Sequence, residues 1–318
     1  MVDQERPGPA NHRSARRWLV SGLVITLVAA MVAHVWRSHE ELAALQRVSA
    51  PVLILTLLVQ FLSQLSFNSA LLLPLRTYMK TLGYWEFFVV RTGGFLAGYV
   101  VPVAGGLAVR LSYLRRRGLA YADFTWATLL SNVLALAAAG VLAVLATGML
   151  WMVAGAPPTL LLGLSAGVLA LGATALAVFQ ALPRLAGHPR LQRWRWLSVL
   201  SGFHASRRTT TWVFAHSLVR HTLNFVTFGW LYQALSPVPG GFLTGGLVYA
   251  VASPLRMIQI TPGNLGVDEW VAAIVGKMLA FDVTTGLIVA LVFRGLTLLS
   301  QGLGVLVAWA WLALRSEP

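Results

Sequence analysis

The segment "ITPGNLGVDEW", residues 260–270, places helix breakers and charges where the surrounding apolar pattern predicts a membrane-embedded helix. The apolar region around it extends from 242 to 281. Lipid offers no hydrogen-bond partners, so non-helical backbone at membrane depth must be buried in protein or line a wet cavity. The segment therefore predicts a broken helix inside a membrane protein, with a polar cavity around "TPGNLG".

The composition is that of an integral membrane protein. Of the 318 residues, 57% are apolar and only 11% are charged, so a soluble domain of this length could not cover its surface with polar groups. A helix needs about 20 apolar residues to cross about 30 Å of hydrocarbon. We expect six such helices, the first of them uncleaved, at 18–36, 51–75, 122–150, 159–182, 210–235 and 284–314. Two further apolar regions, 86–109 and 242–281, are interrupted by Pro and Gly.

Several protein classes are excluded by what the sequence lacks. The chain has no cysteine, which excludes disulfides and thiolate metal sites. It has no phosphate-binding loop and no His/Asp cluster with ligand spacing, so we expect no cofactor and no metal. The net charge of +14 comes from arginines at segment ends, which membrane orientation and anionic lipids both favour, and nucleic acid is not an expected partner.

The positions of the positive charges predict the topology. If 86–109 crossed the membrane fully, Arg110, the arginines up to Arg117 and the arginine-rich loop 183–208 would all be exported, against the positive-inside rule. A re-entrant hairpin at 86–109 keeps them cytoplasmic. We therefore predict a plasma (inner) membrane protein with a cytoplasmic tail at 1–17 and a cytoplasmic C-terminus. Charge does not decide whether 242–281 is re-entrant or fully spanning.

The spacing of the two broken regions predicts an inverted repeat. Pro102 lies 51 residues after the helix that starts at 51, and Pro262 lies 52 residues after the helix that starts at 210. The repeat units would be 51–150 and 210–314, linked by 159–208 within one membrane domain, 18–318. The alternative is that membrane helices recur at such intervals by chance. Inverted repeats with discontinuous helices are an architecture of transporters.

The predicted fold is thus an all-α polytopic membrane protein with about six transmembrane helices and two Pro/Gly-broken re-entrant hairpins. The residues expected to break the two hairpins are Pro102, Gly105, Gly106, Pro262, Gly263, Asn264 and Gly266.

Charged residues at membrane depth are the candidate binding groups. Asp268 and Glu269 follow the second break, so both could cap the half-helix that begins there. Alternatively, one caps and the other faces the cavity and pairs with an intramembrane arginine, for which the candidates are Arg220, Arg256 and Arg294. Because the first hairpin carries arginines, we predict a site between the hairpins for an anionic headgroup. The predicted substrate-binding residues are Arg91, Arg110, Arg220, Arg256, Asp268, Glu269 and Arg294.

Polar residues also recur at helical spacing on two of the predicted helices. They are Gln60, Gln64 and Asn68 on the first, and His216, Arg220 and Asn224 on the second. Such stripes join helices more often than they bind ligands. The segment "RLQRWRWLSVLSGFHASRR", 190–208, is either an interfacial helix or an ordinary cytoplasmic loop.

Two motifs resemble a known family. The stretches "RTGGFLAGYVVPVAGGLAVRLSYLRRRGLAYADFTWATLLSNV" (91–133) and "TPGNLGVDEWVAAIVG" (261–276) are similar to the flippase-like membrane family that includes the transmembrane half of bacterial lysylphosphatidylglycerol synthases. The positions that match the family pattern are Pro102, Gly106, Arg110, Pro262, Gly263, Leu265, Gly266, Val267 and Glu269. The departures are Leu107 and Ala108 in place of an acid, Ser131 and Asn132 in place of Glu-Arg, Asn264 in place of Gly and Asp268 in place of Arg.

The resemblance implies lipid translocation. Family members that synthesise aminoacyl lipids carry a soluble domain after the membrane part, and this chain ends at Pro318, so we expect no such enzyme activity. Two alternatives stay open: a non-catalytic partner or regulator of a lipid-modifying enzyme, and an intramembrane enzyme acting on lipids. The expected partners are membrane lipids with anionic or polar headgroups. The sequence specifies neither the lipid nor the oligomeric state.

Overall fold

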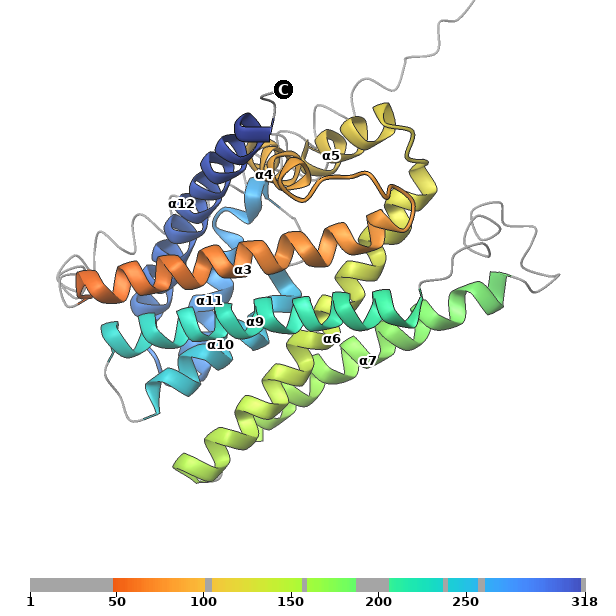
Figure 1. Ribbon diagram of the computed structural model, residues 1–318. Helices are drawn as coiled ribbons and strands as arrows, with labels where there is room; N and C mark the ends of the chain where they lie inside the picture. The colour runs from red at the N-terminus through yellow and green to blue at the C-terminus, as the bar shows by residue number, and fades with distance from the viewer. Residues whose placement is uncertain are drawn as a thin grey trace, which may run out of the picture.

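The computed structural model describes residues 48–100, 105–155, 159–186, 206–236, 240–256 and 261–315, and this part of the chain consists of helices and short connections (Figure 1). Five predicted transmembrane segments are single helices. They are α3 (Ala50–Arg76), α6 (Tyr121–Ala154), α7 (Thr159–Ala186), α9 (Arg207–Leu235) and α12 (Val283–Arg315). The predicted helix at 18–36, the predicted break at Pro102 and the segment 190–205 lie outside the described residues.

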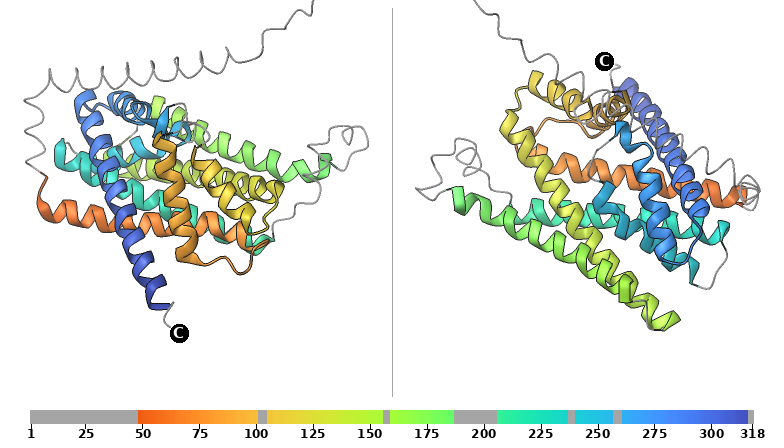
Figure 2. Two further views of the ribbon diagram at one scale, coloured as in Figure 1. Left: turned by 90° about the horizontal axis from the view of Figure 1, so that it is seen from above. Right: turned by 180° about the vertical axis from the view of Figure 1, so that it is seen from behind.

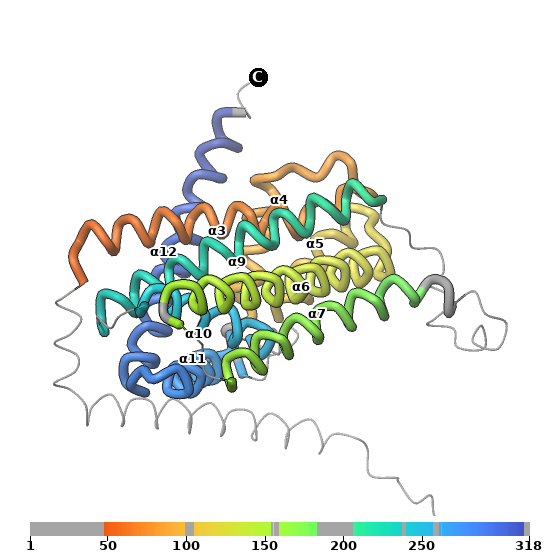
Figure 3. Tube along the Cα trace, turned by 90° about the horizontal axis from the view of Figure 1, so that it is seen from below, coloured from red at the N-terminus to blue at the C-terminus, as the bar shows by residue number. Residues whose placement is uncertain are grey.

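Four of the described helices, α3, α6, α7 and α12, are long and apolar enough to cross a membrane. The helix α9 has 29 residues but a more polar sequence, and it packs lengthwise against α3 with the opposite chain direction (Figures 1 and 3). Its N-terminus is fixed by Ser206, whose hydroxyl accepts a hydrogen bond from the Thr209 N–H at 3.1 Å. The helices thus form the bundle of a multi-pass membrane protein.

The first broken region is a hairpin of α4 (Tyr84–Val100) and α5 (Gly105–Arg116). Its arms touch through backbone: a Cβ atom on Gly94 would lie 2.8 Å from the carbonyl oxygen of Gly106. Only glycine allows such an approach. Apolar side chains from the start of α4 and the end of α5 pack in one cluster with the end of α3 and the start of α6. The chain therefore enters and leaves the hairpin at the same end of the bundle.

The second broken region consists of α10 (Gly241–Arg256), the short 3-10 turn η2 (Pro262–Asn264) and α11 (Val267–Met278). The helix is interrupted because Gly263, Asn264 and Gly266 all have left-handed backbone, with φ of 56°, 53° and 81°. Glycine adopts this conformation without strain, and asparagine tolerates it better than most residues. The break thus falls on the "PGNLG" residues.

The two halves of the chain pack in a matching pattern. The helix α12 lies against α3 and against α4 of the first hairpin, while α6 lies against α9 and against α10 of the second broken region (Figure 2). In addition, α4 packs against η2, so the two broken regions meet. A buried cluster of aromatic and aliphatic side chains from α6, α9, α10, α11 and α12 forms the largest part of the core.

Candidate functional site

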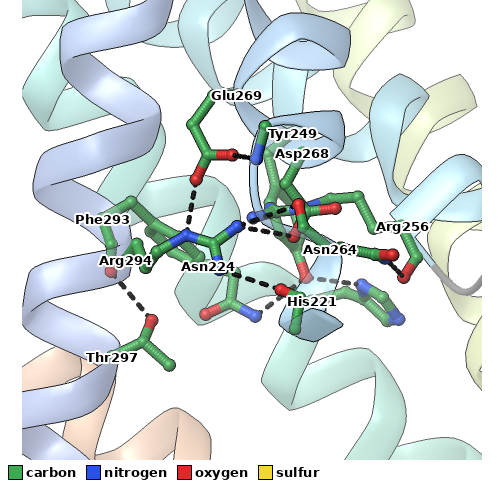
Figure 4. A network of polar contacts seen from close by, with 12 residues as sticks. His221, Asn224, Tyr249, Arg256, Asn264, Asp268, Glu269, Phe293, Arg294 and Thr297 are labelled. Atoms are coloured by element: carbon green, nitrogen blue, oxygen red, sulfur yellow. Dashed lines mark hydrogen bonds and ion pairs between the residues drawn. The ribbon is translucent and has the colours of Figure 1, made fainter. Parts of the chain in front are cut away.

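A network of ion pairs surrounds the second break (Figure 4). Glu269, in the first turn of α11, is fully buried. Its carboxylate accepts hydrogen bonds from the Gly266 N–H at 2.8 Å and from Nε of Arg294, on α12, at 2.5 Å. One residue therefore performs both roles that the sequence suggested, since Glu269 caps α11 and also neutralises an intramembrane arginine.

Arg294 also completes the hydrogen bonding of the broken backbone. Its Nη1 donates to the carbonyl oxygen of Gly263 at 2.8 Å, and its Nη2 donates to that of Asn264 at 3.2 Å. Unpaired carbonyls are costly away from water. The side chain of Asn264 donates in turn to the carbonyl oxygen of Arg256 at 3.0 Å, at the end of α10. Side chains thus supply hydrogen bonds to the backbone on both sides of the break.

Asp268 is held more loosely than Glu269. Its Oδ2 lies 3.5 Å from Nε of Arg256 and 3.7 Å from Nη2 of Arg294, and its buried Oδ1 has no hydrogen-bond partner among the described residues. The guanidinium of Arg256 also faces three aromatic rings, the nearest being Phe293 at 5.1 Å. Two arginines, Arg256 at the end of α10 and Arg294 on α12, therefore balance the charges of Asp268 and Glu269.

Arg91, on α4, has no such counter-charge. It is only 3% exposed, and its Nη1 donates to Oε1 of Gln64 at 3.1 Å. Its Nε and Nη2 are buried and have no hydrogen-bond partner in the described part of the chain. The guanidinium lies 4.9 Å from the ring centroids of both Phe67 and Phe88. A buried cation with two open donors is therefore present at the first hairpin.

Two further arginines lie close to Arg91. The Arg220 guanidinium is 3.6 Å from the centroid of the Phe67 ring, which Arg91 also contacts. Arg110 donates from Nε to the carbonyl oxygen of Gly106 at 3.2 Å, and the charges of Arg110 and Arg220 both act on Arg91. None of the three forms an ion pair with a described residue. We call Arg91, Arg110 and Arg220 the arginine cluster.

The structure thus separates the seven predicted binding residues into two neighbouring groups. Arg256, Asp268, Glu269 and Arg294 form the ion-pair network, whereas the arginine cluster stands beside it without carboxylates. Arg220, a candidate partner for the acids, does not pair with them, because α10 and α12, which pack directly on α11, supply Arg256 and Arg294 instead. Of the predicted breaking residues, Gly105 and Gly106 open α5, and Pro262 opens η2.

The polar stripes join the helices around the site. Nε2 of Gln60 donates to Oδ1 of Asn224 at 3.0 Å, and Nδ2 of Asn224 donates to the Tyr249 hydroxyl at 2.8 Å. Oε1 of Gln64 accepts from Arg91 and, at 3.4 Å, from Nε2 of Gln301. Sequence reasoning did not single out Tyr249 or Gln301. Each is a polar residue within an apolar helix, which could have indicated a polar contact, because a buried hydroxyl or amide needs a hydrogen-bond partner.

These features define a polytopic helical membrane protein with a charged site where two broken regions meet. A sequence model of the lysylphosphatidylglycerol synthase TM region matches residues 17–304. The chain therefore belongs to this family, and the resemblance seen in the two motifs is confirmed. A comparison with curated proteins found no match.

Proposed function

We propose that this protein moves a lipid with an anionic headgroup between the two leaflets of the membrane. The observation that carries the proposal is the arginine cluster: three arginines lie together with no ion-pair partner in the described residues, and one of them is almost fully buried. Removing a charge from water without a counter-charge costs several kcal/mol. An anionic headgroup would supply that counter-charge, while the acyl chains stay in the bilayer.

The proposal includes the topology. Six membrane-crossing helices and two re-entrant hairpins would form an inverted repeat, with the N- and C-termini in the cytoplasm of a plasma membrane protein. Three observations support this topology. The helices α3 and α9 pack side by side with opposite chain directions, and the packing of α12 on α4 matches that of α6 on α10. The first hairpin also begins and ends at the same end of the helix bundle. The arginines at the end of α5 would lie on the cytoplasmic side.

The site suits a headgroup rather than a small soluble ion because it combines charge with depth. Arg220 and Arg91 lie near the middle of α9 and α4, and α9 is long enough, at about 1.5 Å per residue, to cross the hydrocarbon layer. A headgroup that enters between the hairpins would therefore meet the arginines about halfway across. Fixed, preoriented guanidinium groups replace the water that the headgroup loses.

Lipid movement in liposomes tests the proposal. The purified protein is reconstituted with a trace of fluorescent phosphatidylglycerol or, in parallel, of fluorescent phosphatidic acid, and a membrane-impermeant reductant then bleaches the outer leaflet. We expect wild type to expose the inner-leaflet lipid and Arg110→Gln to slow this at least about tenfold, the effect of losing about 1.4 kcal/mol of interaction. The matched control is Arg116→Gln, an exposed arginine on the same helix, which should keep wild-type rates.

Two results would contradict the proposal. One is a wild-type protein that moves neither of the two anionic lipids. The other is an Arg110→Gln protein as fast as wild type. A protein that only positions a partner enzyme would give the first result.

A further inference from the structure

The open donors of Arg91 form one defined edge. In a guanidinium group the Nε–H and one Nη–H lie parallel on the same side, and this fork binds two oxygens of one carboxylate or phosphate. In Arg91 the other nitrogen, Nη1, is held by Gln64, and Nε and Nη2 are the buried atoms without a partner. The fork is therefore fixed in place by Gln64 and by the rings of Phe67 and Phe88.

No carboxylate of the described chain occupies this fork. Asp268 and Glu269 belong to the ion-pair network, and Glu86 pairs with Arg117 at 2.7 Å. Arg220 contacts the same Phe67 ring as Arg91, so the two guanidinium carbons are no farther apart than the sum of their distances to that ring. The fork thus faces an environment in which two further arginines repel Arg91 and nothing described neutralises it.

The number of donors distinguishes between phosphate types. A phosphodiester headgroup has two terminal oxygens and one negative charge. A phosphomonoester has three terminal oxygens and carries about −1.5 to −2 charges at pH 7. Three arginines match three oxygens, and an excess of three positive charges is neutralised better by the second charge. A headgroup that bears an added ammonium group would instead meet like charges.

We propose that the arginine cluster selects a phosphomonoester headgroup, as in a diacylglycerol phosphate or a polyprenyl phosphate, over phosphodiester and aminoacylated headgroups. This inference rests on the proposed function, because it names the headgroup that the transport site would accept. It assigns Arg91 as the bidentate ligand of the phosphate, with Arg110 and Arg220 contacting the remaining oxygen. Gln64 acts as the positioning residue that orients the Arg91 fork.

Equilibrium binding to the purified full chain tests this selectivity. Short-chain phosphatidic acid, a polyprenyl phosphate, phosphatidylglycerol and lysyl-phosphatidylglycerol are titrated in detergent at pH 8 and pH 5. At pH 8 we expect at least one phosphomonoester to bind about tenfold or more tightly than phosphatidylglycerol, and lysyl-phosphatidylglycerol to bind most weakly. The two phosphomonoesters share a headgroup, so comparing them shows which tail the protein accepts.

The pH dependence provides a second readout. The second ionisation of a phosphomonoester lies near pH 6, so at pH 5 only about a tenth of it carries the second charge. Its affinity should therefore fall about tenfold from pH 8 to pH 5, while the affinity of phosphatidylglycerol, which has no such ionisation, stays constant. Equal affinities for the phosphomonoesters and phosphatidylglycerol at pH 8, or a preference that does not change with pH, would overturn the proposal.

Variants locate the selectivity. Arg91→Gln should reduce the phosphomonoester preference to about one, and Arg220→Gln gives a second test at a less buried position if Arg91→Gln does not fold. Arg116→Gln should retain the preference. A retained preference in both cluster variants would overturn the assignment.

The outcome also separates this inference from the proposed function. Liposomes in which phosphatidylglycerol moves as readily as phosphatidic acid, together with equal binding, would remove the selectivity and leave transport standing. Selective binding without movement of any lipid would contradict the proposed transport function but support the phosphomonoester site.

Discussion

Glu269→Gln tests the ion pair that joins the second broken region to α12. The substitution keeps the shape of the side chain and removes its charge. The carboxylate accepts from Gly266 N–H at 2.8 Å and from Arg294 Nε at 2.5 Å, and it is fully buried. Breaking a buried pair by removing one partner costs about 3–5 kcal/mol, because the other charge is left uncompensated.

The structure narrows this range. Glutamine can still accept a hydrogen bond from the Gly266 N–H through its amide oxygen, so the cap of α11 is partly kept. Arg294 also keeps Asp268 at 3.7 Å and its two backbone carbonyl acceptors. We therefore expect a loss of about 3 kcal/mol, near the lower end of the range for a broken buried pair.

Thermal unfolding in detergent, followed by tryptophan fluorescence, gives the measurement. A double-mutant cycle with Arg294→Gln isolates the pair, because removing both charges should cost less than the two single losses combined, by about 1–3 kcal/mol. Lys277→Gln is the matched control, since Lys277 is an exposed charge on the same helix and its loss should stay within about 0.5 kcal/mol. A Glu269→Gln protein as stable as wild type, or strictly additive losses, would refute the reasoning.

Three further changes test other parts of the structure. Arg91→Met should raise the stability of the lipid-free protein by about 1 kcal/mol or more in thermal scans, because it removes a buried cation that pairs with no described carboxylate. A loss of stability with unchanged lipid binding would contradict this prediction. Gly94→Ala should destabilise the protein by about 1–3 kcal/mol, because its Cβ would lie 2.8 Å from a carbonyl oxygen of α5. Gly98→Ala is the control and should be neutral, since Gly98 has open space around it. Equal stability of the two variants would contradict this close packing of α4 on α5. Tyr113→Phe removes the hydroxyl that donates a hydrogen bond to Glu86, so it should lower the free energy of unfolding by about 1 kcal/mol. It should also speed amide hydrogen exchange at the open end of the first hairpin, and unchanged exchange would count against that contact.

The long helices could be predicted from the sequence because their signal is local. The apolar run at 51–75 became α3 (Ala50–Arg76), and the run at 122–150 became α6, which extends to Ala154. The end of α6 is set by Gly155, whose φ of 83° stops the helix. Apolar length and glycine punctuation are both visible in the sequence, so these elements needed no tertiary information.

The pairing of charges is different, because it depends on how helices rotate and pack. The sequence offered three arginines as partners for Glu269 and did not rank them. One signal could have selected Arg294: a short turn joins α11 to α12, so residues about equally far from that turn lie at similar depth on neighbouring antiparallel helices. Arg256 precedes the break, and its position depends on a backbone path that no periodicity describes.

The two departures from the family pattern around the second break have local explanations in the structure. Asn264, where glycine is usual, keeps the left-handed φ of 53° and uses its side chain to hold the end of α10. Asp268, where arginine is usual, supplies the negative charge near Arg256. With arginine at 268, the ion-pair network would hold three positive charges, Arg256, Arg294 and the new side chain, against Glu269 alone.

The two broken regions differ in how the charges around them are balanced. At the second, the ion-pair network of Arg256, Asp268, Glu269 and Arg294 is neutral, because each carboxylate lies close to an arginine. At the first, Arg91, Arg110 and Arg220 form no ion pair with a described residue, since Glu86 of α4 pairs with Arg117. Under the proposed function, a bound anion would supply the missing counter-charge. The helix α4 packs on η2, so the arginine cluster and the ion-pair network lie near the contact between the two broken regions. Under the proposed function, this difference in charge would place the headgroup site at the arginine cluster rather than at the second break.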